Sequence, residues 1–335
     1  MTKTIAIVTP VLDDWTSFAA LVAEISYLFT GSDLAFHIYA LDDGSRVPFD
    51  FNSIALPVDT CVAEIEVIRL AVNLGHQRAI AVGLCAVADA DKIDTVLVMD
   101  SDGEDRPVDI AALLRASQHH PVQVVLAQRA KRSESRTFRF WYCVYKLLFR
   151  ALTGQTISFG NYCIMSKAAV RRLAYMPELW NNLAASIMRS RLPYMTVPTI
   201  RGSRFAGRST MDLASLVVHG LSAMSVHTDM IFVRVLLAAS VIASVASLGI
   251  IAVTVIRIVT DLAIPGWATT AVGDLLIILV QTLVIVVAAS LTMLAGRSSR
   301  PIVPIVDSQR FVVGRERCRF DRRDVAVTVQ RRGAP

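Results

Sequence analysis

Val-Leu-Val-Met-Asp-Ser-Asp-Gly-Glu-Asp-Arg-Pro, residues 96–107, is the stretch that decides the fold. It begins as a short apolar run, typical of a buried strand, and stops abruptly at a cluster of acids. Ligand sites of open α/β sheets lie at the carboxyl ends of such strands, so the stretch predicts an α/β sheet with a site at its edge. Asp100 and Asp102 stand two residues apart, so a continuing strand would point both carboxylates to one face.

Two carboxylates at the end of a strand are typical ligands of Mg²⁺ or Mn²⁺. These ions use few protein oxygens and take their other ligands from substrate phosphates. Asp102 and Asp100 are therefore the candidate metal ligands. The alternative is an acidic turn with solvated carboxylates, and an isolated Asp-x-Asp forms such a turn more often than a metal site.

The composition predicts a membrane-bound protein. The chain has 335 residues, of which 54% are hydrophobic, which suits a domain of roughly 200 residues together with membrane spans. Arg234 and Arg257 enclose 22 uncharged residues, and Asp274 and Arg297 enclose another 22. At about 1.5 Å per residue each run covers roughly 33 Å, enough for a hydrocarbon core of about 30 Å.

The net charge lies entirely after the second apolar run. From Arg297 onward there are ten Arg and four acids, a surplus of six that equals the formal charge of +6. Basic flanks at Arg234 and Arg297 predict an inner (plasma) membrane protein whose α/β domain and termini are cytoplasmic, with a tail attracted to anionic headgroups. No basic face with interleaved aromatic residues occurs, so no nucleic-acid partner is predicted. Five scattered cysteines indicate neither a disulfide framework nor a zinc site.

Strand and helix patterns alternate through about residue 130, which predicts a mostly parallel sheet covered on both faces. The strand patterns before and after residues 96–99 cover residues 4–11, 34–41, 65–70 and 122–127. Asp42-Asp43-Gly44-Ser45 follows one of them and puts a carboxylate within reach of a base or ribose hydroxyl, although such a tetrapeptide also forms ordinary turns.

Two further regions could bind phosphate. Asn73 and Gly75 precede a helix whose first N–H groups could face an anion, or the helix is simply capped and packed on the sheet. Cationic and hydroxyl side chains gather in two later segments, after the strand at 122–127 and in the loop 201–209. The first of these segments could equally be a solvated loop. Those we select as phosphate-binding candidates are Arg129, Arg136, Arg139, Arg204 and Ser209.

Taken in order, these motifs resemble the family-two glycosyltransferases of GT-A fold, in particular the dolichol-phosphate mannose synthases and bacterial polyprenyl-phosphate glycosyltransferases. The resemblance covers about residues 4–230. Family motifs Pro-x-x-Asn-Glu, Asp-Asp-Gly-Ser, Asn-x-Gly, Asp-Ala-Asp-Leu-Gln-x-x-Pro and Arg-x-x-Gly-Glu-Ser are matched by residues 10–14, 42–45, 73–75, 100–107 and 204–209. Glu104 stands in the place of the Gln.

The resemblance implies a metal-assisted hexosyltransferase that moves a sugar, with inversion, from a UDP- or GDP-sugar to a membrane polyprenyl phosphate. It implies catalytic roles for Asp100, Asp102, Glu104 and Arg129, and a donor site that includes Pro10, Asp14, Asp42, Asp43, Asn73, Gly75, Arg136, Arg139, Arg204 and Ser209. The predicted organisation is a GT-A domain (1–208), a juxtamembrane helix (209–229), spans at 230–257 and 274–296 joined by a loop (258–273), and an Arg-rich tail (297–335). In this tail the alternation at residues 311–313 suggests a small folded element, although disorder fits equally well. A homo-oligomer is left open.

Two departures from the family pattern leave the acceptor open. Asn161 and Cys163 stand where relatives carry the Asp and Arg of Gly-Asp-Phe-Arg, and Arg208 replaces a Glu. Residues 179–199 contain no Asp or Glu to act as a base, which an ionised phosphate acceptor does not need. The alternatives are another membrane-proximal acceptor such as a glycolipid, or a catalytically inactive membrane scaffold.

Overall fold

The computed structural model describes residues 3–54, 56–57, 59–90, 92–119, 124–129, 136–155, 159–206, 213–260, 266–320 and 328–333. The chain divides into two compact units. The sheet unit comprises Met1–Phe138, Ile157–Val226 and Ile302–Pro335, and the helical unit comprises Arg139–Thr156 and His227–Pro301. The chain therefore leaves the sheet unit and later returns to it.

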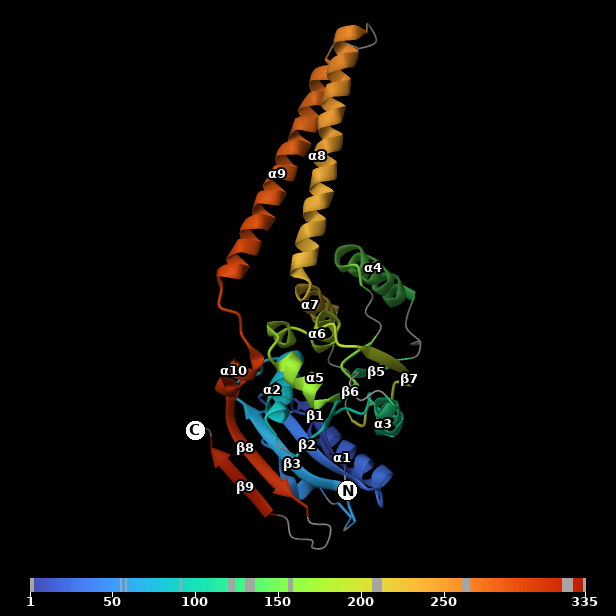
Figure 1. Cartoon of the computed structure of the whole chain (residues 1–335), viewed down its shortest axis with the longest axis vertical. Helices are drawn as coiled ribbons and strands as arrows, with labels where there is room; N and C mark the ends of the chain where they lie inside the picture. Colours follow the sequence, from blue (N-terminus) through green and yellow to red (C-terminus); the bar gives the residue numbers. More distant parts are fainter. Residues whose placement is uncertain are drawn as a thin grey trace. The chain divides into compact units, whose positions relative to one another are not determined.

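In the described part of the sheet unit, nine strands form one sheet in the order β7-β5-β6-β4-β1-β2-β3-β8-β9. At its centre, β4, β1, β2 and β3 are parallel, as are β5 and β7, whereas β6, β8 and β9 pair antiparallel with their neighbours (Figure 1). The predicted α/β fold is confirmed. The strands are β1 (Lys3–Val11), β2 (Leu34–Asp42), β3 (Val62–Leu70), β4 (Thr95–Val98), β5 (Val124–Arg129), β6 (Cys163–Ser166), β7 (Tyr194–Thr199), β8 (Val312–Arg319) and β9 (Thr328–Gly333).

Helices cover both faces of the sheet, as strands with apolar residues on both sides require. Neighbouring strand residues point to opposite faces, so Ile7 belongs to one buried cluster and Val8 to the other. On the Ile7 face lie α1 (Trp15–Phe29), η1 (Phe51–Ser53), η2 (Pro107–Asp109) and α3 (Ile110–His119). On the Val8 face lie α2 (His76–Ala88), α5 (Lys167–Ala174), η3 (Pro177–Trp180), α6 (Leu183–Arg189), α10 (Pro304–Asp307) and η4 (Ser308–Phe311).

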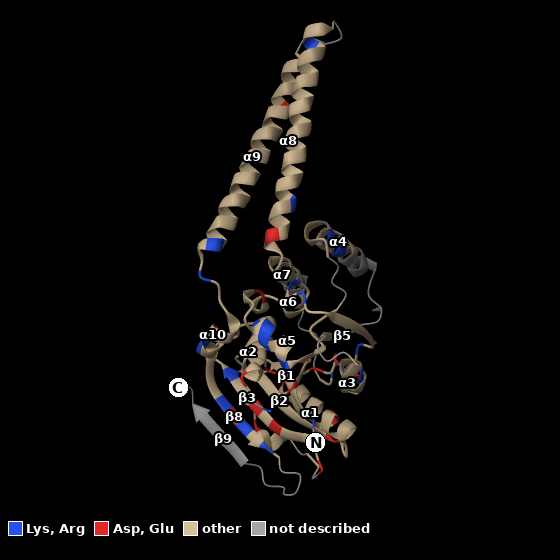
Figure 2. Cartoon of the chain, in the orientation of Figure 1, with Lys and Arg blue, Asp and Glu red and all other residues tan. Residues whose placement is uncertain are grey.

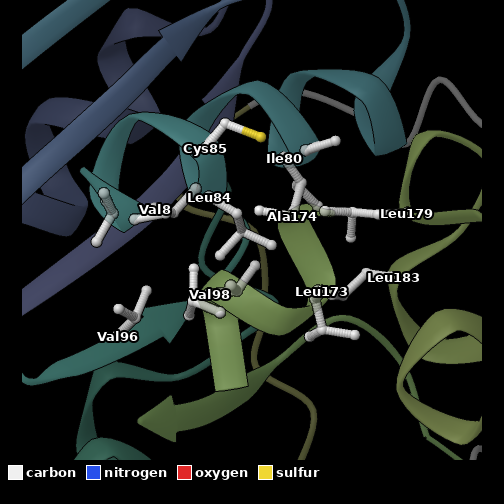
Figure 3. Close-up of a cluster of buried hydrophobic side chains, with 14 of the residues drawn as sticks. Val8, Ile80, Leu84, Cys85, Val96, Val98, Leu173, Ala174, Leu179 and Leu183 are labelled. Atoms are coloured by element: carbon white, nitrogen blue, oxygen red, sulfur yellow. The ribbon is translucent and has the colours of Figure 1, made fainter. Parts of the chain in front are cut away.

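The Val8 face is packed closely (Figure 3). Leu84 and Cys85 of α2 lie with Val98 of β4 in the same buried cluster. A Cβ on Gly83 would come within 2.5 Å of Val8 Cγ1, so only glycine lets α2 lie this near β1. Burial raises the pKa of the Cys85 thiol to about 12, which makes it a packing residue rather than a nucleophile.

Phe18 of α1 is the residue whose truncation should most weaken the Ile7 face. Its side chain is fully buried, and its ring meets those of Trp15 and Phe49 edge-on with centroids 5.7 and 5.3 Å apart. We expect Phe18→Ala to lower the free energy of unfolding by about 3–5 kcal/mol in denaturant titrations of the detergent-solubilised protein. The matched control is Tyr27→Ala on the same helix, because Tyr27 is 82% exposed. Equal losses in both variants would contradict the packing described here.

The helical unit contains two long apolar helices, α8 (Thr228–Val259) and α9 (Trp267–Ser298), that form a hairpin (Figure 1). Each has 32 residues, with mean hydropathies of 2.4 and 2.6 over their most apolar windows. Both are long and apolar enough to cross a membrane, and they contain the predicted spans 230–257 and 274–296. Most of α4 (Arg136–Thr153) also lies in this unit, where Arg234 donates to the backbone carbonyl of Arg150. The amphipathic pattern before α8 forms α7 (Leu213–Ser225) in the sheet unit.

The structure divides the last residues differently from the predicted tail at 297–335. Residues from Ile302 onward belong to the sheet unit, and β8 pairs antiparallel with β3. Arginines occupy every second position of β8 from Arg315 to Arg319 and lie beside two glutamates of β3 (Figure 2). Arg315, Arg317 and Arg319 pair with Glu66 or Glu64 at 3.0–3.9 Å. These three charges thus have carboxylate partners within the sheet, whereas the sequence predicted them for anionic headgroups.

Candidate functional site

The predicted site motifs meet at the carboxyl ends of the parallel strands. Val11 at the end of β1 lies opposite Asp42 at the end of β2, and Asp43 N–H donates to the Val11 carbonyl at 2.9 Å. Ser101, in the acid motif after β4, donates its hydroxyl to the Pro10 carbonyl at 3.1 Å. Three motifs far apart in sequence therefore share one edge of the sheet.

Asp42 is held on both of its carboxylate oxygens. Its side chain is 1% exposed, its Oδ1 accepts the Ser45 N–H at 2.8 Å, and its Oδ2 lies 3.5 Å from Arg69 Nε. Asp14, predicted for the same donor site, instead caps α1 by accepting the Ser17 N–H at 3.3 Å. Asp42 is therefore the more firmly held of the two carboxylates.

The Asn73–Gly75 turn is held by side chains of the protein. The carboxylate of Asp43 accepts the N–H groups of Leu74 and Gly75 at 2.7 and 3.0 Å, and Asn73 Oδ1 also accepts the Gly75 N–H at 2.9 Å. The Gly75 N–H is thus satisfied by protein oxygens, which agrees with the alternative of a helix that is simply capped. Burial raises the pKa of Asp43, although these two N–H groups partly offset it. Asp43 fixes the turn that starts α2.

The acid motif after β4 folds on itself. Asp105, buried at 2% exposure, accepts the Asp100 N–H at 3.0 Å, and Asp102 Oδ1 accepts the Glu104 N–H at 2.9 Å. The side chains of Asp102 and Glu104 are 14% and 15% exposed. The Asp102 carboxylate is therefore oriented by a backbone turn, and both carboxylates are partly accessible.

A basic loop, residues 201–205, lies against this motif. Arg204 donates Nε and Nη2 to Asp102 Oδ2 at 2.9 and 2.6 Å, and Arg201 donates to Glu104. Backbone bonds add to these contacts, since Gly202 N–H donates to the Glu104 carbonyl at 2.9 Å and Phe205 N–H to the Asp102 carbonyl at 2.8 Å. The sequence predicted Arg204 but missed Arg201, whose only signal was its place in the same loop.

The two side-chain oxygens of Asp102 fit a divalent cation. They are carboxylate oxygens, the ligands that Mg²⁺ and Mn²⁺ prefer, and a guanidinium cation already lies on Oδ2. Within the described ranges, no three His, Cys, Asp or Glu side chains gather as a closed metal cage. A metal here would take several of its ligands from phosphate and water, as Mg²⁺ commonly does.

Asp100 faces a histidine that sequence reasoning missed. His76 Nε2, at the start of α2, lies 3.2 Å from Asp100 Oδ1 and 3.1 Å from the Asn161 amide nitrogen. Gln77 joins Asn161 to the Leu183 N–H through bonds of 3.1 and 2.9 Å. Desolvation lowers the pKa of His76, but the nearby carboxylates, Asp100 foremost, leave it raised. The signal for His76 was its position directly after the Asn73–Gly75 motif.

For three of the remaining predicted residues the structure describes only the backbone, and for one it describes nothing. Arg129 ends β5 opposite Thr199. Arg136 and Arg139 lie on α4, while Ser209 falls outside the described residues, as do the side chains of these three arginines. Their phosphate contacts stay predictions. Cys163, in place of the family Arg, is fully buried on β6 and packs in the core, whereas Asn161 contacts His76.

The chain is similar to a number of solved structures, and two of them are complexes of one enzyme. One is glucosyl-3-phosphoglycerate synthase from Mycobacterium tuberculosis in complex with Mn²⁺, uridine-diphosphate-glucose and phosphoglyceric acid, 17% identical with a TM-score of 0.48, covering 68% of this chain and 80% of that one. The other is the same synthase with Mg²⁺ and uridine diphosphate, 18% identical with a TM-score of 0.48, covering 68% and 79%. No curated protein sequence matches the chain significantly.

The family comparison covers more than half of the chain. The family model described as glycosyl transferase family 2 matches residues 7–179. This span contains Asp42 and the acid motif with Asp100 and Asp102, which the structure brings to one edge of the sheet. The predicted enzyme class is therefore confirmed, and the chain belongs to glycosyl transferase family 2.

Proposed function

We propose that the protein transfers a sugar, with inversion, from a UDP- or GDP-sugar to a polyprenyl phosphate in a membrane. The observation that carries the proposal is the connection of two features in one chain. The acidic edge with Asp42 and Asp102 belongs to a unit that leads directly, at Val226, into a hairpin able to cross a membrane. A lipid acceptor suits a transferase built in this way.

The donor would bind along the acidic edge. Asp42 offers oriented acceptor oxygens to the nucleoside, and Arg201 and Arg204 supply guanidinium donors for the diphosphate. A divalent ion held by Asp102, with Asp100 beside it, would neutralise the charge that develops on the leaving nucleoside diphosphate. Arg204 and the ion would then share the role of balancing Asp102.

The acceptor needs positioning more than deprotonation. A phosphate monoester is largely ionised at neutral pH, so its oxygen attacks without a strong general base. Residues 179–199 accordingly contain no Asp or Glu. Among the residues around Asp100, His76 and the neutral Asn161 provide groups that can face an anion without repelling it. A polyprenyl phosphate therefore fits the chemistry of this side of the site.

The test uses the full chain in detergent with Mn²⁺, labelled UDP- and GDP-sugars, and undecaprenyl phosphate. We expect an acid-labile lipid-linked sugar with one donor. Polyprenol, which has the isoprenoid chain but no phosphate, is the matched control and should accept no sugar. Label on a glycolipid hydroxyl with none on polyprenyl phosphate would replace the proposal by the glycolipid alternative. Absence of transfer to both acceptors, with intact nucleotide binding, would favour the scaffold.

A further inference from the structure

A row of charged side chains crosses three neighbouring strands at the donor edge. Asp42 on β2 lies directly opposite Arg69 on β3, and Arg69 lies opposite Gly314 on β8. Arg69 Nε is 3.5 Å from Asp42 Oδ2, and its Nη2 is 3.5 Å from Glu316 Oε1. One guanidinium therefore joins the donor-site carboxylate to the strand that follows the apolar hairpin.

The register of β8 makes this contact possible. Gly314 has no side chain, so the guanidinium of Arg69 can extend past it toward Glu316, two residues away on the same face. Ala71 N–H donates to the Phe311 carbonyl at 2.8 Å, which fixes where β8 begins. The Arg317–Glu66 pair at 3.0 Å fixes the strand on the opposite face.

The exposed fraction of each side chain in the row indicates which of them can change its rotamer. Asp42 is 1% exposed, whereas the Arg69 side chain is 39% exposed and Glu316 is 20% exposed. An arginine this accessible has many rotamers, and a second carboxylate restricts them. With Arg69 restricted, both oxygens of Asp42 keep fixed partners and their remaining lone pairs keep fixed directions.

We propose that Glu316 is a positioning residue of the donor site, which holds Arg69 against Asp42 and thereby orients the carboxylate that receives the nucleoside. The inference rests on the proposed nucleotide-sugar donor. Strand β8, which follows the apolar helices in the sequence, then contributes to donor binding in addition to covering the edge of β3. Loss of Glu316 weakens donor binding and leaves the acceptor side unchanged.

The test measures nucleotide binding by calorimetry with the full chain, Mn²⁺ and no acceptor. UDP and GDP are both titrated, and the tighter one is used for the variants. We expect Glu316→Gln to weaken binding by about threefold to fivefold, the upper part of the range for a partly exposed ion pair. In turnover assays the donor KM should rise by the same factor while kcat and the acceptor KM stay within about twofold.

The matched control is Arg319→Gln. Arg319 pairs with Glu64 at 3.4 Å on the same two strands, but its pair lies at the other end of β3 from Arg69. This variant loses a comparable ion pair and should bind nucleotide normally. A double-mutant cycle identifies the route, because Glu316→Gln combined with Arg69→Gln should bind no more weakly than Arg69→Gln alone. Thermal unfolding of each variant checks that the sheet is retained.

The outcomes separate this inference from the proposed function. Unchanged affinity in Glu316→Gln, or equal weakening in Arg319→Gln, overturns the role of Glu316 and leaves the donor class standing. Additive losses in the double variant overturn the route through Arg69. If the unaltered protein binds neither UDP nor GDP, the proposed donor class fails and this inference fails with it.

Discussion

Sugar transfer by Asp102→Asn is expected to fall by about a thousandfold or more, the loss of roughly 4 kcal/mol of transition-state stabilisation. Asp102 Oδ2 carries a cation, and an amide oxygen has no charge with which to hold one. Its Oδ1 bond to the Glu104 N–H can persist in the variant, so the turn should survive. Initial rates across a range of Mn²⁺ concentrations measure the effect, and metal binding followed by electron paramagnetic resonance gives a readout without turnover.

Asp33→Asn is the control for this substitution. Asp33 is an exposed carboxylate directly before β2, at the opposite end of that strand from Asp42. It should retain the full rate and the same Mn²⁺ dependence. An Asp102→Asn enzyme with undiminished Mn²⁺ affinity would show that the ion is held elsewhere.

Gly202→Ala is expected to lower kcat/KM by about a hundredfold, because it moves the basic loop by an ångström or more. A Cβ at this position would lie 2.2 Å from the Gly103 carbonyl oxygen and 2.8 Å from Arg106 Cγ. The backbone must therefore shift, which breaks the 2.9 Å bond from Gly202 N–H to the Glu104 carbonyl. Arg201 and Arg204 flank this glycine in the loop and would leave their carboxylates with it.

Steady-state kinetics with varied donor concentration measure the loss in this variant. Gly273→Ala is the control, because no heavy atom lies within 4 Å of a Cβ built at that position on α9. That substitution should leave kcat/KM within about twofold. If Gly202→Ala retained full activity, the contact of loop 201–205 with the acid motif would have no part in turnover.

Most of the sheet could be predicted because buried parallel strands are continuous apolar runs. The predicted strand at 34–41 became Leu34–Asp42, and the one at 65–70 became Val62–Leu70. Only the start of strand β8 could be recognised, as a small element at residues 311–313, since Arg315, Arg317 and Arg319 alternate along the rest of it and suggest a solvated tail. Their partners on β3 lie as many as 255 residues earlier, and only the fold brings them together.

The site was predictable where a strand end carries the chemistry. Asp42, Asp100 and Asp102 follow apolar runs, and the structure brings their motifs together. Side-chain pairings across the chain left no such signal. The Arg204–Asp102 pair joins residues 102 apart, and the Asn161–His76 contact joins residues 85 apart. A local sequence pattern does not show which distant residue will accept a hydrogen bond from a given N–H group. The Gly75 N–H, for example, donates to Asp43, 32 residues earlier.

The pairing of β8 with β3 also sets an order in time. Glu66 of β3 and Arg315 of β8 stand 249 residues apart, with α8 and α9 between them. During synthesis the edge of β3 that faces away from β2 therefore stays unpaired until both apolar helices have left the ribosome. If α8 and α9 cross a membrane, the chain must cross it an even number of times for β8 to reach β3 on the side where the sheet lies. The sheet can therefore be completed only in a molecule whose apolar helices have turned back and returned the chain to β3.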